Sequence, residues 1–174
     1  MSKKELIVGG GCFWCMEAVF ELLNGVEDVV SGYANGDVPN PDYKMVCSGT
    51  SGYAEVVKIT YDEDKISVDT LLKVFFELHD PTTLNRQGGD RGTQYRSTIL
   101  YTDKDTKKRA LKAKLKAQDI YCDDIVTVIE PLENFHLAED YHQDYFRLNG
   151  NQGYCMAVVA PKVQKVKDKF SDKM

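Results

Sequence analysis

The sequence predicts an α+β sandwich, in which helices cover one face of a mixed β-sheet. Two observations support this prediction. Strand-like and helix-like apolar patterns alternate to give several local β-α-β units, and 174 residues suffice for one compact core. A doubly wound parallel sheet is the competing fold, since length alone is compatible with both. We expect residues 1–174 to form a single domain, with 149–174 as a C-terminal tail.

The first elements have clear local signals. The apolar run 5–8 predicts a short buried strand, which three consecutive glycines end. A helix is predicted over 12–24, because apolar residues recur there every three or four positions and Gly25 follows as a stop. The segment 26–33 is then predicted to be a second strand.

The middle of the chain continues the alternation. Residues 53–61 alternate between two faces, as a half-buried strand does. Ser67 is expected to cap a helix that runs to about His79, and a strand is predicted at 95–102. Asp103 is expected to cap a lysine-rich helix that ends near residue 119.

The last third is predicted less sharply. A strand is predicted at 125–130 and a helix at 138–148, and Pro161 is expected at the start of a final helix. Two long glycine-rich loops, 34–52 and 80–93, separate the regular elements. Loops of this length in compact domains are usually functional.

Composition excludes several classes of protein. The net charge of −5 argues against general nucleic-acid binding, which requires a basic surface. The sequence has no apolar run long enough to span a membrane and no secretory signal near its N-terminus, so we expect a cytoplasmic location. An odd number of scattered cysteines, five, predicts reduced thiols.

Cys12 is the first candidate for chemistry. It follows a strand and opens a helix, where free backbone N–H groups are expected to lower the pKa of its thiol. A buried structural cysteine is the alternative. With Cys15 it forms a C-x-x-C pair, typical of dithiol oxidoreductases or of half a zinc site. Two further closely spaced zinc ligands are missing from the sequence, so we expect no metal.

Glu55 is the second candidate. It shares the inward face of its predicted strand with Val57 and Ile59. A carboxyl group at the end of an apolar face is partly desolvated, which raises its pKa and suits it to act as a general acid. The alternative is an exposed strand end, where Glu55 faces water.

Several blocks of the sequence, in order, resemble the methionine sulfoxide reductase A family, peptide reductases that act on the S epimer. The resemblance covers about residues 6–170. The blocks are Gly10-Gly11-Cys12-Phe13-Trp14-Cys15, Asn40-Pro41-Asp42-Tyr43, Cys47 to Val57, Asp90 to Ser97, Ala138 to Gln143, Gly153-Tyr154-Cys155 and Ala160 to Val163. The chain departs from the family at Tyr53, where a His is common, and at Gly89, where an Asn is common.

The resemblance implies a ferredoxin-like sandwich and a role for each matching residue. Cys12 matches the nucleophile, Glu55 the acid that protonates the sulfoxide oxygen, and Cys155 the resolving cysteine. The other matches are Tyr43 and Tyr95 as hydroxyls that bond this oxygen, Asp90 as a supporting polar residue, and Phe13 and Trp14 as the pocket for the substrate's S-methyl group.

The implied reaction is a thiol reduction of methionine sulfoxide, free or in proteins, that needs no cofactor. Cys12 becomes a sulfenic acid, a second thiol forms a disulfide with it, and thioredoxin or a similar dithiol reduces the disulfide. Cys155 is favoured as that second thiol and Cys15 is the alternative. A monomer is expected. A general C-x-x-C disulfide oxidoreductase and a module that binds methionine without chemistry are the competing functions.

Overall fold

The computed structural model describes residues 3–174 and contains a six-stranded sheet in the order β7-β6-β1-β3-β2-β8. Its strands are β1 Lys3–Gly9, β2 Val26–Ala34, β3 Ala54–Asp62, β6 Thr98–Tyr101, β7 Val128–Pro131 and β8 Phe135–Leu137. Only the β6–β7 pair is parallel. The inner order β6-β1-β3-β2 is that of a ferredoxin-like split β-α-β fold. The predicted α+β class is therefore confirmed over the doubly wound alternative.

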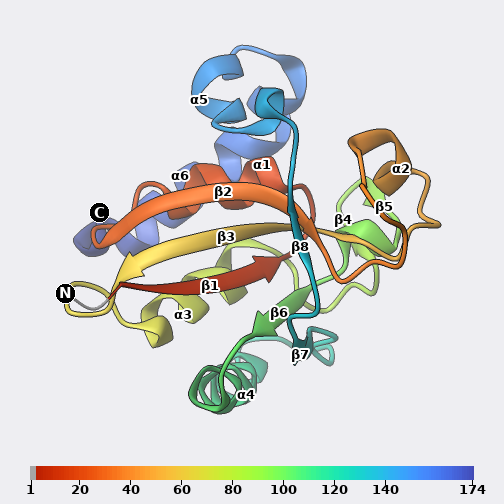
Figure 1. The fold of residues 1–174 in the computed structure, drawn as a ribbon. Coiled ribbons are helices and arrows are strands. Elements are labelled where there is room, and N and C mark those ends of the chain that lie inside the picture. The colour runs from red at the N-terminus through yellow and green to blue at the C-terminus, as the bar shows by residue number, and fades with distance from the viewer. Residues whose placement is uncertain (1–2) are drawn as a thin grey trace.

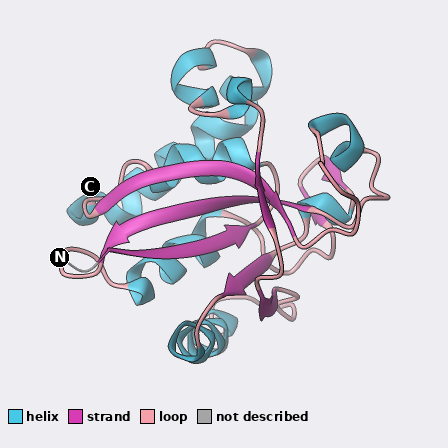
Figure 2. Ribbon diagram, viewed as in Figure 1, coloured by secondary structure: helices cyan, strands magenta, loops and turns pink. Residues whose placement is uncertain are grey.

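The six α-helices of residues 3–174 lie behind the strands or around the edges of the sheet in Figures 1 and 2. They are α1 Phe13–Phe20, α2 Tyr43–Cys47, α3 Val68–Leu78, α4 Lys104–Gln118, α5 Tyr145–Asn149 and α6 Ala160–Phe170. Helices α1, α3 and α6 enclose the main apolar core with the sheet, and α4 packs on α3 and β6. The other face carries a small cluster around Val56 and Leu100, covered by Leu132 and Phe135.

The predicted helix caps are present. Ser67 Oγ accepts a hydrogen bond from the Thr70 N–H at 3.1 Å, and Asp103 Oδ1 accepts one from the Thr106 N–H at 2.7 Å. Each cap satisfies an N–H group that the first helical turn leaves free. Among residues 3–174, no helix is both long and apolar enough to cross a membrane.

Several predicted elements differ from the structure, and the helix predicted over 12–24 ends earlier, at Phe20. Residues 138–148 are not one helix: a 3-10 turn at Asp140–His142 and the short α5 occupy this stretch, directly after the unpredicted strand β8. The strand predicted at 125–130 begins three residues later, at Val128, and that predicted at 95–102 is shortened to β6. The loop 80–93 contains a small hairpin of β4 Arg86–Gln87 and β5 Asp90–Arg91.

The stretch that carries Cys155 is helical. Cys155–Val159 forms a π-helical turn that runs directly into α6, which packs on α1 and α3. Pro161, near the start of α6, lacks the N–H that would close an α-helical bond to the preceding turn. The π-helical turn thus lies where the α-helical hydrogen-bond ladder is interrupted.

Candidate active site

Cys12 lies at the N-terminal cap of α1, in a sharp turn after β1. The backbone approaches its neighbours too closely there for larger residues. A Cβ on Gly10 would lie 2.7 Å from His79 Cδ2, and Gly11 has a φ of +87° and would place a Cβ 2.7 Å from Gln87 Cγ. Only glycine combines that φ with such close packing. The glycines thus allow the strand to deliver Cys12 directly to the helix start.

The Cys12 thiol is nearly enclosed, with 6% of the residue exposed. Burial raises the pKa of Cys12 well above its ordinary value, the negative charge of Glu55 raises it further, and a hydrogen bond from the Trp14 backbone lowers it. The predicted lowering of this pKa is wrong for the unliganded site, because loss of hydration outweighs the helix N-terminus. Cys12 therefore holds its proton at neutral pH, and its activation has to accompany proton transfer.

Glu55 is also buried, with 1% exposed, and it faces the main core beside the start of α1. Its Oε1 accepts a hydrogen bond from the Phe13 N–H at 3.3 Å, while Oε2 finds no partner among residues 3–174. Burial raises the pKa of Glu55 to about 8, the Phe13 N–H lowers it and the charge of Asp90 raises it. The predicted rise is confirmed, and the carboxyl group carries a proton at pH 7.

The hydroxyls of Tyr43 and Tyr95 both lie close enough to Glu55 for its charge to raise their pKa values. Burial raises the pKa of Tyr95, and the charge of Glu55 is the next cause. The pKa of Tyr43 is raised first by burial, then by a hydrogen bond to Cys47, then by Glu55. Both hydroxyls therefore keep their protons near neutral pH and can act as hydrogen-bond donors. No local pattern in the sequence places Tyr43, the first residue of α2, near Glu55 on β3.

The wall formed by Phe13 and Trp14 is held by residues that the sequence did not single out. The Trp14 indole Nε1–H donates to Nδ1 of His142 at 3.0 Å, and the Tyr145 ring stacks on Trp14 at 3.7 Å between centroids. Because Nδ1 accepts, His142 is the neutral Nε2–H tautomer. Phe13 is fully buried and lies 5.0 Å from the His142 ring. A long-range hydrogen bond of this kind leaves no periodic signal in a sequence.

Asp90, on β5, is brought to the site by the small hairpin. Its partner in the strand pair, Gln87, packs against Gly11 just before Cys12. Asp90 Oδ2 accepts a hydrogen bond from the Tyr154 hydroxyl at 2.6 Å, and the Tyr154 ring meets Trp14 edge-on at 5.7 Å. Tyr154, which the sequence reading gave no role, therefore joins the hairpin to the segment that precedes Cys155.

Two further buried thiols belong to α1 and to the π-helical turn that packs against α1. Cys15 is one helical turn along α1, with its N–H bonded to the Cys12 carbonyl at 3.1 Å, and Cys155 opens the π-helical turn. Both are fully buried and free. Burial raises the pKa of Cys15 to about 11, and the charge of Cys155 contributes to this rise. The remaining cysteines, Cys47 and Cys122, are exposed.

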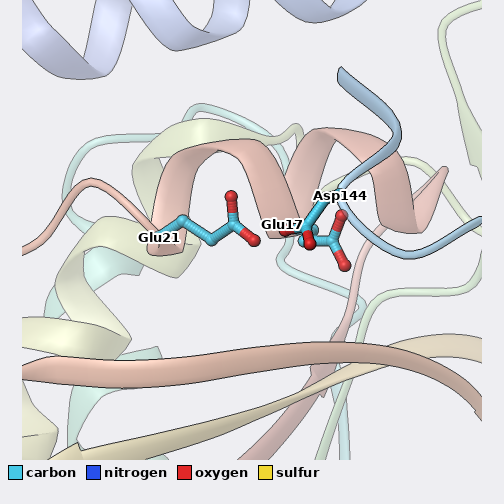
Figure 3. A group of neighbouring side chains, drawn as sticks. All are labelled: Glu17, Glu21 and Asp144. Carbon is cyan, nitrogen blue, oxygen red and sulfur yellow. The ribbon is translucent and has the colours of Figure 1, made fainter. Parts of the chain in front are cut away.

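A carboxylate cluster fastens α1 to the segment that leads into α5. Figure 3 shows Glu17 and Glu21, both on the α1 side, pointing toward Asp144, and the carboxylate oxygens lie within 4.8 Å of one another. Burial raises the pKa of Glu17 to about 7 and that of Glu21 to about 8, and Asp144 raises both further. Arg147 pairs with Asp144 at 2.9 Å. The cluster therefore retains protons near neutral pH, beside the residues that position Trp14.

The departure at Tyr53 has a structural counterpart. Its hydroxyl donates to the carbonyl of Val38, and its ring lies edge-on to His136 at 5.7 Å. Tyr53 is buried with 2% exposed, directly before β3. The side chain thus fastens the loop 34–52 to the strand that carries Glu55.

Comparison with known proteins gives a consistent result. A family model described as peptide methionine sulfoxide reductase matches residues 4–174. The peptide methionine sulfoxide reductase MsrA of Nautilia profundicola is 57% identical over 163 residues, which cover 92% of each chain. The crystal structure of Mxr1 from Saccharomyces cerevisiae in reduced form has a TM-score of 0.84 at 40% identity, covering 88% of this chain and 90% of that one. Mxr1 in complex with Trx2 has a TM-score of 0.60 at 29% identity, covering 83% and 85%.

Proposed function

This chain belongs to the peptide methionine sulfoxide reductase family, and we propose that Cys12 performs its reaction with Glu55 as the proton donor. One observation carries this assignment. The unpartnered Oε2 of Glu55 belongs to a carboxyl group that is protonated at neutral pH, beside a buried thiol that is protonated as well. A buried polar atom without a partner has to be explained, and a substrate oxygen would satisfy it.

The first step then transfers oxygen from the substrate to Cys12. Glu55 donates its proton to the sulfoxide oxygen, while the hydroxyls of Tyr43 and Tyr95 stabilise the charge that develops there. The Cys12 sulfur attacks the sulfoxide sulfur, the substrate's sulfur–oxygen bond breaks as its hydroxyl forms a new sulfur–oxygen bond to Cys12, and methionine leaves. Cys12 is oxidised to a sulfenic acid as the sulfoxide is reduced, and the thiol proton returns to Glu55.

Phe13 and Trp14 are proposed to hold the S-methyl group of the substrate. Both lie directly after Cys12 on α1, so a sulfoxide sulfur in contact with the thiol has its methyl group against these rings. The apolar wall is rigid because Trp14 is both hydrogen-bonded and stacked. Preference for the S epimer is part of the proposal because it is the activity of the family that the sequence resembles.

The second step forms a disulfide, and we propose Cys155 as the resolving thiol. The Cys155 sulfur attacks the Cys12 sulfenic acid, a sulfur–sulfur bond forms, and the hydroxyl leaves with the thiol proton as water. Because Cys155 is fully buried in a helical turn, this step requires local unwinding. Cys15 is the second candidate, since it is already one turn from Cys12.

A dithiol protein such as thioredoxin is the proposed reductant of that disulfide. The complex of the related Mxr1 with Trx2 supports this choice. The proposal includes methionine sulfoxide in peptides or proteins as substrate, action as a monomer, and a reducing cytoplasmic location, which five free cysteines favour. No bound cofactor is required by the chemistry described.

The decisive experiment measures methionine released from each sulfoxide epimer with dithiothreitol as reductant. We expect turnover of the S epimer, none of the R epimer, and none by Cys12→Ser. Turnover of disulfides alone would indicate a C-x-x-C oxidoreductase, and binding without turnover a recognition module. For the resolving thiol, Cys155→Ser should lose thioredoxin-dependent turnover but keep a single release of methionine, whereas loss in Cys15→Ser alone would assign that role to Cys15.

A further inference from the structure

The hydroxyl of Tyr154 connects the segment that carries Cys155 to the β4–β5 hairpin beside Cys12. The half-buried Tyr154 directly precedes Cys155, and its hydroxyl donates to Asp90 at 2.6 Å. Asp90 lies on the hairpin whose Gln87 packs against Gly11, next to Cys12. A single hydrogen bond thus ties the segment with the proposed resolving thiol to the turn with the proposed nucleophile.

The segment held by this bond is poised to unwind. Cys155–Val159 is a π-helical turn, a rare interruption of α-helical hydrogen bonding that is frequently found at functional sites. It is preceded by Gly150 and Gly153, and a Cβ on Gly153 would meet no atom within 4 Å. A hollow of about 580 Å³, lined by residues that include Asp90, Tyr154, Val158 and Lys162, lies beside the bond. The turn therefore has both a weak point and room to move.

We propose that the Tyr154–Asp90 hydrogen bond is a latch that keeps Cys155 in its helix while Cys12 is a thiol and that opens when Cys12 carries oxygen. This inference rests on the proposed function, because the oxygen comes from the sulfoxide. Tyr154 acts here as a positioning residue for the second step and acts only through Cys155.

The latch opens because the sulfenic acid on Cys12 needs a hydrogen-bond partner. A sulfenic hydroxyl on a sulfur that is 6% exposed needs a partner inside the cavity. Asp90 is the nearby charged acceptor, since it pairs with Gln87, which packs against Gly11 next to Cys12, and its charge acts on the Cys12 thiol. The sulfenic O–H donates to Asp90 and displaces the Tyr154 hydroxyl. The oxidised state thereby exchanges the Tyr154–Asp90 bond for a bond that the thiol state cannot form, which is the differential interaction that a switch requires.

The latch determines when the Cys155 thiol becomes available to react. With Cys12 reduced, Cys155 is sequestered, so it cannot be oxidised or alkylated prematurely. After oxygen transfer, Cys155 is released and its thiol displaces the hydroxyl of the sulfenic acid as water, which leaves the Cys12–Cys155 disulfide. Tyr154 stays attached to the same segment and moves with it.

The test measures alkylation of Cys155 by iodoacetamide in the full-length reduced protein, read by peptide mass spectrometry. Without substrate, Tyr154→Phe should raise the alkylation rate of Cys155 about tenfold, because it removes a hydrogen bond to a charged group and keeps the ring against Trp14. Asp90→Asn should raise it less, since a neutral acceptor remains. The matched control is Gln152→Ala, which removes a hydrogen bond from Tyr145 onto the same segment and should leave the rate unchanged.

A second measurement distinguishes a failure of the latch from a failure of the proposed function. With one equivalent of the S sulfoxide and no reductant, methionine release reports the first step and loss of the Cys155 thiol reports the second. In Tyr154→Phe we expect methionine release within about twofold of wild type and faster disulfide formation after it. Methionine release with Cys155 alkylated at the wild-type rate in the variant would overturn the latch alone, whereas no methionine release by wild type would overturn the proposed function.

Folding of the variants is checked by circular dichroism. If Tyr154→Phe does not fold, Asp90→Asn decides the outcome, since it preserves the size of the side chain. Alkylation of Cys155 in Asp90→Asn at the wild-type rate would then count against the latch.

Discussion

The β1–α1 corner, residues 3–20, and the segment 132–159 both contribute to the site, but different features of the sequence determine their structures. The corner is specified by local pattern: an apolar strand, a glycine turn and an apolar helix, each readable within about ten residues. The later segment consists of short elements whose shape is set by contacts with α1, such as the bond from Trp14 to His142. The corner therefore provides the scaffold and the thiol, while the segment positions what surrounds them.

The largest expected effect is on the free energy of unfolding, and it tests whether the corner contributes more to stability than the segment does. Phe20→Ala on α1 removes a fully buried ring and should lower the free energy of unfolding by about 3–5 kcal/mol. Leu148→Ala on α5 trims a side chain that is 72% exposed and should change it by less than about 0.5 kcal/mol. Urea denaturation of the two variants measures the contrast, and similar losses would show that the segment is as much a core element as the corner.

The second prediction concerns Glu55, the acid on β3 that accepts a hydrogen bond from the corner at the Phe13 N–H. Glu55→Gln should lower the rate of methionine release by about a hundredfold with little change in substrate affinity, because general acid catalysis typically contributes that much. Since the pKa of Glu55 is about 8, the wild-type rate of this step should fall as pH rises through 8, as the acid loses its proton. Single-turnover kinetics from pH 6 to 9 measure both. A variant with the wild-type rate would remove Glu55 from the mechanism.

The sequence predicted the strand and the helix start of the corner, and the neighbouring strand β3, because their signals are local, although α1 ends at Phe20 and not near residue 24. The strand, the helix start at Cys12 and the inward face of Glu55 all follow from periodicity of a few residues, and burial then raised the pKa of Glu55 as expected. The direction of the Cys12 pKa shift was missed because it depends on how far the sulfur is buried. The charges of Glu55 and Cys15, at other positions in the chain, raise this pKa further.

The segment was predicted poorly for a related physical reason. Residues 138–148 have a helical composition, but His142 and Tyr145 are used to contact Trp14, and Asp144 adopts a left-handed φ of +55° between them. Tertiary contacts therefore override local propensity there. The resemblance to a family supplied roles for matching residues, yet it assigned none to His142, Tyr145 or Tyr154, which surround Trp14 in space.

The third prediction tests the dependence of the corner on the segment. His142→Ala leaves the Trp14 indole N–H without its buried partner, which should lower kcat/KM for methionine sulfoxide about tenfold, mainly through KM. His136→Ala on β8 is the matched control and should lower it less than twofold, since that ring contacts Tyr53 instead. Equal effects of the two substitutions would show that Trp14 keeps its position without the segment.

The smallest expected effect lies at the junction of the two regions, in the carboxylate cluster. Glu17 and Glu21 bind protons more tightly in the fold than in the unfolded chain, with pKa values of about 7 and 8 against an ordinary 4.5. The wild-type stability contributed by the cluster should therefore fall as pH rises from about 4.5 to 8 and stay level above that. Glu21→Gln removes one of these groups, so its melting temperature should fall less between pH 6 and 8.5 than that of wild type. The corresponding difference in the free energy of unfolding should be below about 1 kcal/mol because Glu21 is half-exposed and screened.

Trp14 provides a direct optical readout of this junction, because it is the only tryptophan in the chain. Loss of protons from the cluster adds repulsion between α1 and the start of α5, which should loosen the stacking of Tyr145 on Trp14. The fluorescence of the folded wild type should then change with a midpoint between pH 7 and 8. His142 does not produce this signal, since burial lowers its pKa. Glu133→Gln, an exposed control, should titrate as wild type does, while an identical midpoint and amplitude in Glu21→Gln would show that the two regions meet independently of these protons.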